Sequence, residues 1–165
     1  MLASGASGLG FTAIRMRLLK SKKLKLFKHP MKNMAKTISL EYRRVAQEFA
    51  GRLSLKFGKK IDAIVLYGSV SRGHAKRSSD IDIMVLTKYA NDLNFTSRAY
   101  DTLVDFELEN DFAFFISLFF VTPETLRKSV MLGTPFIRNV SEDAIGLYGR
   151  SVFEKLTGKL RKTSG

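Results

Sequence analysis

Two short apolar segments with a polar loop between them are the sequence feature that most restricts the fold. Residues 61–67 (IDAIVLY) and 81–86 (IDIMVL) are rich in β-branched side chains and are bounded by glycine, serine or charged residues. Runs of this length and composition are typical of buried strands. The sequence therefore predicts two strands joined by a loop over residues 69–79.

Apolar residues around these strands recur every three or four positions, the spacing of one helix face. In residues 38–57 they are Ile38, Tyr42, Val45, Phe49, Leu53 and Phe57, and in residues 91–109 they are Leu93, Tyr100, Leu103, Val104 and Leu108. Helices are predicted over both ranges. Thr122 and Pro123 predict the start of another helix, with the threonine as N-cap and the proline at the first position. A further helix is predicted over residues 135–145.

A third strand is predicted over residues 112–121 (FAFFISLFFV), which are almost entirely apolar. Such a run is expected to be buried on both faces, with its phenylalanines in the core rather than on a stacking surface. Strands that alternate with helices predict an α/β (α+β) fold, in which a small mixed sheet packs with helices.

Asp80 and Asp82 stand at the start of the second predicted strand. Residues two apart on a strand point to the same face, so the two carboxylates are expected to lie side by side. Like charges repel, and burying them without a partner is unfavourable. A divalent cation between them would remove this conflict, and Mg²⁺ prefers such oxygen ligands. The alternative is structural: Asp80 would cap a turn and Asp82 would pair with a lysine.

The loop before the aspartates has the residues that a phosphate site needs. Gly68 allows the backbone to come close to a ligand, and Ser69 would offer its hydroxyl and N–H groups if it begins a short helical turn. Arg72, Lys76 and Arg77 add positive charge nearby. His74 is expected to be an exposed loop residue. The loop is therefore a candidate triphosphate cradle.

The conjunction of these motifs resembles a known signature. Gly68-Ser69, then Gly73, then Ser79-Asp80-Ile81-Asp82 resemble the DNA polymerase β-like nucleotidyltransferase superfamily, and in particular its small minimal nucleotidyltransferases. A looser likeness extends over residues 37–150. The resemblance implies the polymerase β-like nucleotidyltransferase fold for residues 37–165.

The resemblance also implies a reaction. A nucleoside triphosphate, expected to be ATP, would transfer its nucleoside monophosphate (AMP) to a hydroxyl acceptor with the help of two Mg²⁺ ions. The expected partner is a small helical HEPN-type protein, as in toxin–antitoxin pairs. Asp80 and Asp82 would be the catalytic, metal-binding residues. The implied nucleotide-binding residues are Gly68, Ser69, Arg72, Gly73 and Ser79.

One position departs from the family pattern. Members with activity usually supply a third carboxylate from the third strand, where this chain has Ser117. Asp111, Glu107 or Glu109 could act as a shifted substitute. Without a third carboxylate, a second hypothesis is a catalytically weak or inactive module of the same fold that binds nucleotide or a partner.

The charge of the chain is concentrated at its beginning. Residues 1–36 hold nine lysines and arginines and no acidic residue, within a total net charge of +13. This basic extension is expected to be disordered or to result from a start codon placed too far upstream, and a transit peptide is an alternative. A third hypothesis for function is nucleic-acid binding through this extension.

Composition excludes two other classes of protein. The chain has no cysteine, so disulfides and cysteine-based zinc sites are ruled out. The longest apolar run is about half of the roughly 20 residues that a transmembrane helix needs. The sequence therefore predicts a protein without a membrane span that resides in the cytoplasm.

Overall fold

The computed structural model describes the backbone of residues 9–158 and the side chains of residues 33–158. The chain divides into two compact units, Met1–Ala35 and Lys36–Gly165. In the first unit the described backbone belongs to helix α1, which spans Leu9–Phe57. The assignment of residues 1–36 as an extension outside the nucleotidyltransferase domain stays a prediction, and residues 1–8 lie outside the described part.

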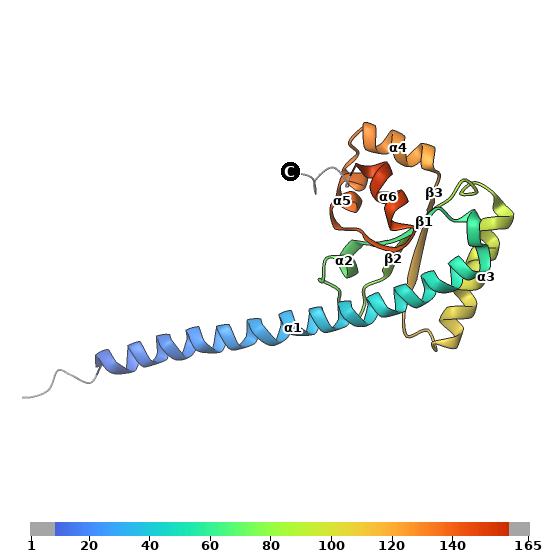
Figure 1. Ribbon diagram of the computed structural model, residues 1–165. Coiled ribbons are helices and arrows are strands. Elements are labelled where there is room, and N and C mark those ends of the chain that lie inside the picture. Colours follow the sequence, from blue (N-terminus) through green and yellow to red (C-terminus); the bar gives the residue numbers. More distant parts are fainter. Residues whose placement is uncertain (1–8, 159–165) are drawn as a thin grey trace, which may run out of the picture. The chain divides into compact units, whose positions relative to one another are not determined.

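The second unit contains a mixed sheet with helices on both faces (Figure 1). The sheet strands are β1 (Ala63–Tyr67), β2 (Ile81–Leu86), β3 (Ile116–Val121) and β4 (Ile145–Tyr148). A 3-10 turn, η1 (Gly58–Lys60), follows α1, and the remaining helices are α2 (Gly68–Ser71), α3 (Leu93–Glu109), α4 (Pro123–Met131), α5 (Pro135–Asp143) and α6 (Arg150–Thr157). The predicted α/β fold with a small mixed sheet is confirmed.

The order of the four strands is β3-β2-β1-β4. Strand β1 pairs antiparallel with both β2 and β4, whereas β2 and β3 pair in parallel. The β1–β2 register places Tyr67 opposite Asp82, and the β2–β3 register places Ser117 beside Asp82. The sheet thus brings the ends of β1, β2 and β3 together around one carboxylate.

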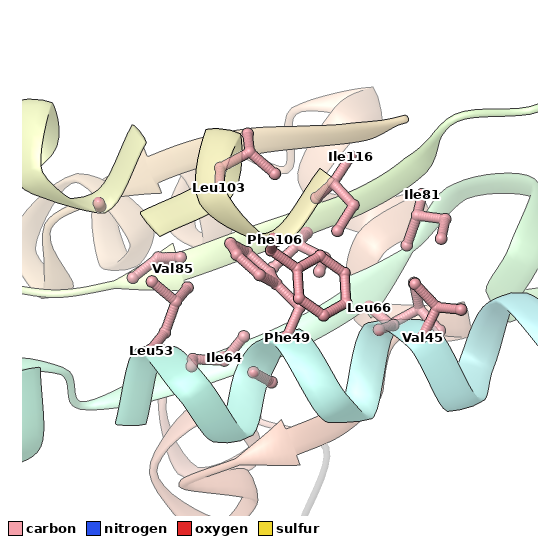
Figure 2. Close-up of a cluster of buried hydrophobic side chains, with 14 of the residues drawn as sticks. Val45, Phe49, Leu53, Ile64, Leu66, Ile81, Val85, Leu103, Phe106 and Ile116 are labelled. Carbon is pink, nitrogen blue, oxygen red and sulfur yellow. The ribbon is translucent and has the colours of Figure 1, made fainter. Parts of the chain in front are cut away.

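The larger core lies between one face of the sheet and helices α1 and α3 (Figure 2). All six apolar residues predicted for the buried face of residues 38–57 are buried. Phe49 of α1 and Phe106 of α3 meet in this core, with ring centroids 5.3 Å apart. Burial of such large side chains is the main source of stability for the fold.

The second core lies on the other face of the sheet, which α4, α5 and α6 cover. Leu126, Ile137 and Phe153, one from each helix, are buried there. The start of α4 is as predicted, because the Thr122 hydroxyl accepts a hydrogen bond from the N–H of Thr125 at 3.1 Å and Pro123 follows it. This is the face of the sheet to which Asp82 also belongs, since Met84 and Leu86 on the same side of β2 pack here.

Strand β3 differs from its prediction in length and in burial. It begins at Ile116, because Asp111 and Phe112 adopt positive φ values of 51° and 53° in the turn that precedes it. It is an edge strand, and Ser117 and Phe119 on one of its faces are exposed, so the expectation of burial on both faces is wrong. Phe112, Phe115 and Phe119 are exposed, whereas Phe114 and Phe120 pack against the larger core.

Two helical predictions also need correction. Helix α3 exists, but it buries Phe95, Ala99, Leu103 and Phe106, and of the residues predicted from spacing only Leu103 is buried. The helix predicted over residues 135–145 ends at Asp143, and Ile145 begins β4, which the sequence did not predict. Helix α6 was not predicted either. Four residues become a strand here because β1 offers them a pairing edge.

Candidate functional site

The carboxylate of Asp82 lies directly against the backbone of Gly68. Gly68 follows β1 and has φ +77°, a conformation that side chains rarely adopt. A Cβ atom at this position would overlap the carboxylate of Asp82. Only glycine therefore lets the turn after β1 lie this close to the acidic side chain of β2. The fold thus brings the Gly-Ser turn against Asp82 of the Asp-Ile-Asp motif.

The surroundings of Asp82 disfavour the ionised form of its carboxyl group. Burial raises the pKa of Asp82, and the nearby charge of Asp80 raises that pKa further, while the positive charge of Arg72 lowers it. Asp80 itself is exposed and Asp82 is half-buried. Burial and the charge of Asp82 likewise raise the pKa of the Tyr67 hydroxyl. A cation next to the two carboxylates would relieve both the repulsion and the cost of burial.

Short contacts within the loop shape the turn around α2. The hydroxyl of Ser71 donates to the carbonyl of Gly68 at 2.9 Å, and the N–H of His74 donates to the carbonyl of Ser69 at 2.9 Å. Gly73 has φ +75° with open space around it. Arg72 reaches out of the loop to α5, where it pairs with Asp143 at 3.6 Å. The hydrogen bonds within residues 68–74 close a compact turn that contains Gly68, Ser69 and Arg72.

Ser79 has a different position from the other predicted nucleotide-binding residues. Its hydroxyl accepts a hydrogen bond from the N–H of Lys76 at 2.9 Å, and its own N–H donates to the carbonyl of Lys76 at 3.0 Å. Ser79 thus closes the turn that leads into Asp80. His74 is exposed, as predicted.

Ser117 occupies the position beside Asp82 on the neighbouring strand. The parallel β2–β3 register pairs the two residues, so their side chains share one face of the sheet. Within residues 33–158 no group of three acidic, histidine or cysteine side chains is placed to hold a metal ion. The site therefore has two carboxylates, with a hydroxyl at the adjacent position.

The predicted substitutes for a third carboxylate are not brought to this site. Glu107 accepts a hydrogen bond from the N–H of Ile116 at 3.0 Å, and Glu109 pairs with Arg52 of α1 at 2.6 Å. Asp111 is exposed in the turn before β3. The three acids are thus engaged by other partners or exposed to solvent, and none is described beside Asp82.

Helix α1 bonds to the loop through three side chains whose contacts the sequence did not predict. The Ser39 hydroxyl accepts from the N–H of Ala75 at 3.1 Å, and the Tyr42 hydroxyl donates to the carbonyl of Arg77 at 2.8 Å. Arg43 donates to the carbonyls of Ser71 at 2.6 Å and of Val70. Tyr42 and Arg43 lie three and four positions after Ser39, so the three residues share one helix face, which the sequence shows. The sequence does not show that this face contacts the loop.

The hydrogen bond of Ser39 is expected to contribute measurably to stability. Ser39→Ala leaves the buried N–H of Ala75 without this acceptor, which should lower the free energy of unfolding by about 1–3 kcal/mol. Ser54→Ala is the matched control, because the Ser54 hydroxyl bonds only to the preceding turn of the same helix, at the Gly51 carbonyl. Urea denaturation of both variants would measure the difference. Equal losses would show that the contact between α1 and the loop adds nothing.

A sequence profile described as "Polymerase beta, Nucleotidyltransferase" matches residues 53–142, more than half of the chain. The chain therefore belongs to the polymerase β nucleotidyltransferase family, and the predicted family is confirmed. The matched segment includes the turn at Gly68, both aspartates and Ser117. No curated protein matches the chain.

Several solved structures are similar to the chain. One, described as a toxin–antitoxin with AMP-PNP, is 24% identical with a TM-score of 0.47, and the match covers 68% of this chain and 82% of that one. A toxin–antitoxin MntA-HpeT mutant is 22% identical over the same shares, also with a TM-score of 0.47. A candidate nucleotidyltransferase from Sulfolobus solfataricus is 17% identical with a TM-score of 0.43, over 68% of this chain and 84% of that one. The family assignment rests on the sequence profile.

None of the helices in the described part of the chain is long and apolar enough to cross a bilayer.

Proposed function

We propose that this chain transfers a nucleoside monophosphate, AMP from Mg-ATP, to a hydroxyl group of an acceptor. The acceptor oxygen would lose its proton and bond to the α-phosphorus of ATP, and the bond from that phosphorus to pyrophosphate would break, so that pyrophosphate leaves. The observation that carries the proposal is the contact between Gly68 and the carboxylate of Asp82. It brings a glycine–serine turn, suited to phosphate oxygens, against a pair of carboxylates suited to a cation. A triphosphate and its metal need both features in one place.

The two aspartates fit a magnesium ion. Asp82 lies in β2 and Asp80 directly precedes that strand. The two carboxylates repel each other, and the pKa of the half-buried Asp82 is raised. Asp80 and Asp82 would hold Mg²⁺, which when bound neutralises charge on the triphosphate and favours ionisation of the acceptor hydroxyl. The donor set consists of hard oxygen atoms, in keeping with this ion.

The other loop residues would bind and orient the triphosphate. Gly68 lets the backbone approach the phosphates, and Ser69 offers its hydroxyl and N–H at the start of α2. Arg72 adds positive charge next to Asp82, as its effect on the pKa of that carboxyl shows. Gly73 and Ser79 shape the turns on either side. The hydrogen bonds between α1 and residues 70–77 would keep the loop in its conformation before the substrate binds.

The acceptor in this proposal is a tyrosine hydroxyl on a small helical partner of HEPN type. This part follows from the resemblance of the motifs to minimal nucleotidyltransferases. Labelled ATP incubated with the chain and such a partner would label the partner if the proposal is correct. Label on RNA instead would identify a nucleic-acid acceptor.

A second candidate is a module that binds nucleotide without efficient transfer. Ser117 favours it, because the serine lies beside Asp82 where a third carboxylate would complete the metal site. In this reading the fold and the triphosphate turn are retained, while the group that would help to activate the acceptor is absent.

The variant Ser117→Asp should distinguish these two candidates. A carboxylate beside Asp82 completes a three-acid site, and we expect Mg²⁺-dependent transfer to rise about tenfold or more. Ser97→Asp, on the exposed surface of α3, is the control for added charge. Initial rates of label transfer from ATP measure the effect. An unchanged rate in both variants would show that this position does not limit transfer.

The experiment that tests the proposed site is a titration of ATP with and without Mg²⁺. The double variant Asp80→Asn/Asp82→Asn should lose metal-dependent binding and transfer. Asp101→Asn/Asp105→Asn, which removes two exposed acids from α3, is the matched control and should behave as the unaltered chain. Full activity in the first double variant would refute the assignment of the metal site.

A further inference from the structure

Three aromatic side chains meet on the face of the sheet that carries Asp82. The ring of Phe136, at the start of α5, packs edge-on against Tyr67 of β1, with centroids 5.7 Å apart. The same ring packs edge-on against Phe119 of β3 at 5.6 Å. We call these residues the aromatic wall. It joins three elements that are distant in sequence, with Phe136 bridging the two outer rings.

The aromatic wall borders the candidate site on two sides. Tyr67 is the register partner of Asp82 on β1 and precedes Gly68 directly. Phe119 lies two residues after Ser117 on β3 and so on the same face of the sheet. Helix α5 supplies Phe136 at one end and, through Asp143, the partner of Arg72 at the other. The rings and the triphosphate turn are therefore held by the same elements.

Two rings of the wall are exposed in part at the surface. Phe119 is 41% exposed and Phe136 is 45% exposed. Deeper on the same face, Met84, Leu86 and Val121 are buried in the second core. Phe119 and Phe136 thus keep part of their ring surface outside that core. Exposed aromatic surface next to polar site residues suits a planar ligand with a charged end.

We propose that Phe119 and Phe136 form a stacking surface for the nucleobase of the bound triphosphate. The inference rests on the proposed function, since the turn at Gly68 would hold the phosphates while the rings contact the base. Phenylalanine rings carry no hydrogen-bonding group, so they would bind every base through its π-face. Purines would bind more tightly than pyrimidines through their larger ring area, and choice between adenine and guanine would need other groups.

The test compares ATP with inorganic tripolyphosphate, which has the phosphates but no base. Binding of each, with Mg²⁺ present, is measured by calorimetry on the full chain. Phe119→Ala and Phe136→Ala should each weaken ATP binding about tenfold and leave tripolyphosphate binding unchanged. Phe115→Ala is the matched control, because Phe115 is 61% exposed but does not belong to the wall. It should change neither affinity.

A second measurement guards against variants that fold poorly. The chain contains no tryptophan, so Phe119→Trp introduces a single tryptophan, which can be excited apart from the tyrosines, at a partly exposed ring position. ATP should quench this fluorescence by stacking, and tripolyphosphate should not. Phe119→Leu keeps an apolar side chain without a ring and should weaken ATP binding as Phe119→Ala does.

The outcomes separate this inference from the proposed function. Equal ATP affinity in the Phe119 and Phe136 variants, with no quenching in Phe119→Trp, would overturn the stacking surface while leaving the triphosphate site intact. Failure of the unaltered chain to bind ATP or tripolyphosphate would instead refute the proposed function itself, and the inference with it. If the Phe119 and Phe136 variants bind ATP more weakly but bind tripolyphosphate as before, and if only ATP quenches Phe119→Trp, the result would support the stacking surface and the triphosphate site.

Discussion

Asp82→Asn is expected to abolish metal-dependent transfer while leaving the fold as stable as before or slightly more stable. Loss of one of two metal-binding carboxylates should lower the transfer rate by about 100-fold or more. The same change removes a half-buried charge that Asp80 repels, which should leave the free energy of unfolding unchanged or raise it slightly. Label transfer from ATP and urea denaturation without metal measure the two effects. Loss of transfer without loss of stability is the result expected for a residue that binds metal and does not stabilise the fold.

The pH dependence of stability should change in the same variant. The pKa of Asp82 is raised in the folded chain, so the folded state binds more protons than the unfolded state between about pH 4, the ordinary value, and the raised value. Asp82 therefore lowers stability as pH rises through that window. Asp82→Asn should flatten this decline, whereas Asp101→Asn, at an exposed acid on α3, should not. Identical profiles for both variants would contradict the burial and repulsion argued for Asp82.

Gly68→Ala is expected to be the most damaging single methyl addition in the loop. Its φ of +77° is unfavourable for alanine by about 1–2 kcal/mol, and its Cβ would overlap the carboxylate of Asp82. Together these effects should lower the free energy of unfolding by about 2–5 kcal/mol. Triphosphate binding should be lost as well, because either the turn or the aspartate must move. Denaturation and ATP titration measure both.

Gly73→Ala is a close control for that prediction. Gly73 has nearly the same φ, +75°, but nothing within 4 Å of the added Cβ. It should therefore lose only the backbone contribution of about 1–2 kcal/mol. In a double-mutant cycle, Asp82→Ala should remove most of the extra loss caused by Gly68→Ala, since the overlapping carboxylate is gone. Equal losses for the two glycines, with no coupling to Asp82, would refute the steric account.

Local patterns in the sequence were sufficient to predict much of the fold. The periodic face of residues 38–57, the strands that became β1 and β2, and the start of α4 at Thr122 are all found. In these segments propensity, capping and burial favour the same structure. Gly68 of the Gly-Ser turn and Asp82 of the Asp-Ile-Asp motif lie against each other, and the site roles predicted for these and the other loop residues stay predictions.

Patterns that fit two arrangements were resolved only by packing. In α3 two sets of apolar residues have helical spacing, and the set with Phe95 and Phe106 is buried because it meets Phe57 and Phe49 of α1. The apolar run before Val121 became an edge strand with exposed rings because β2 offered one free side and nothing covers β3 beyond it within the described residues. Strand β4 formed because β1 had an open edge.

By itself, the sequence determined the residue types that the candidate site contains: a glycine that accepts positive φ, two carboxylates at the start of one strand, and a serine where the family pattern has a third acid. These follow from residue type and from a period of two along a strand. Tertiary structure alone decided that Gly68 meets Asp82, that Ser117 is the neighbour of Asp82, that α1 bonds to the loop, and that Phe119 packs against Phe136. Such contacts depend on sheet register and helix docking, which join residues far apart in the chain and have no local signature.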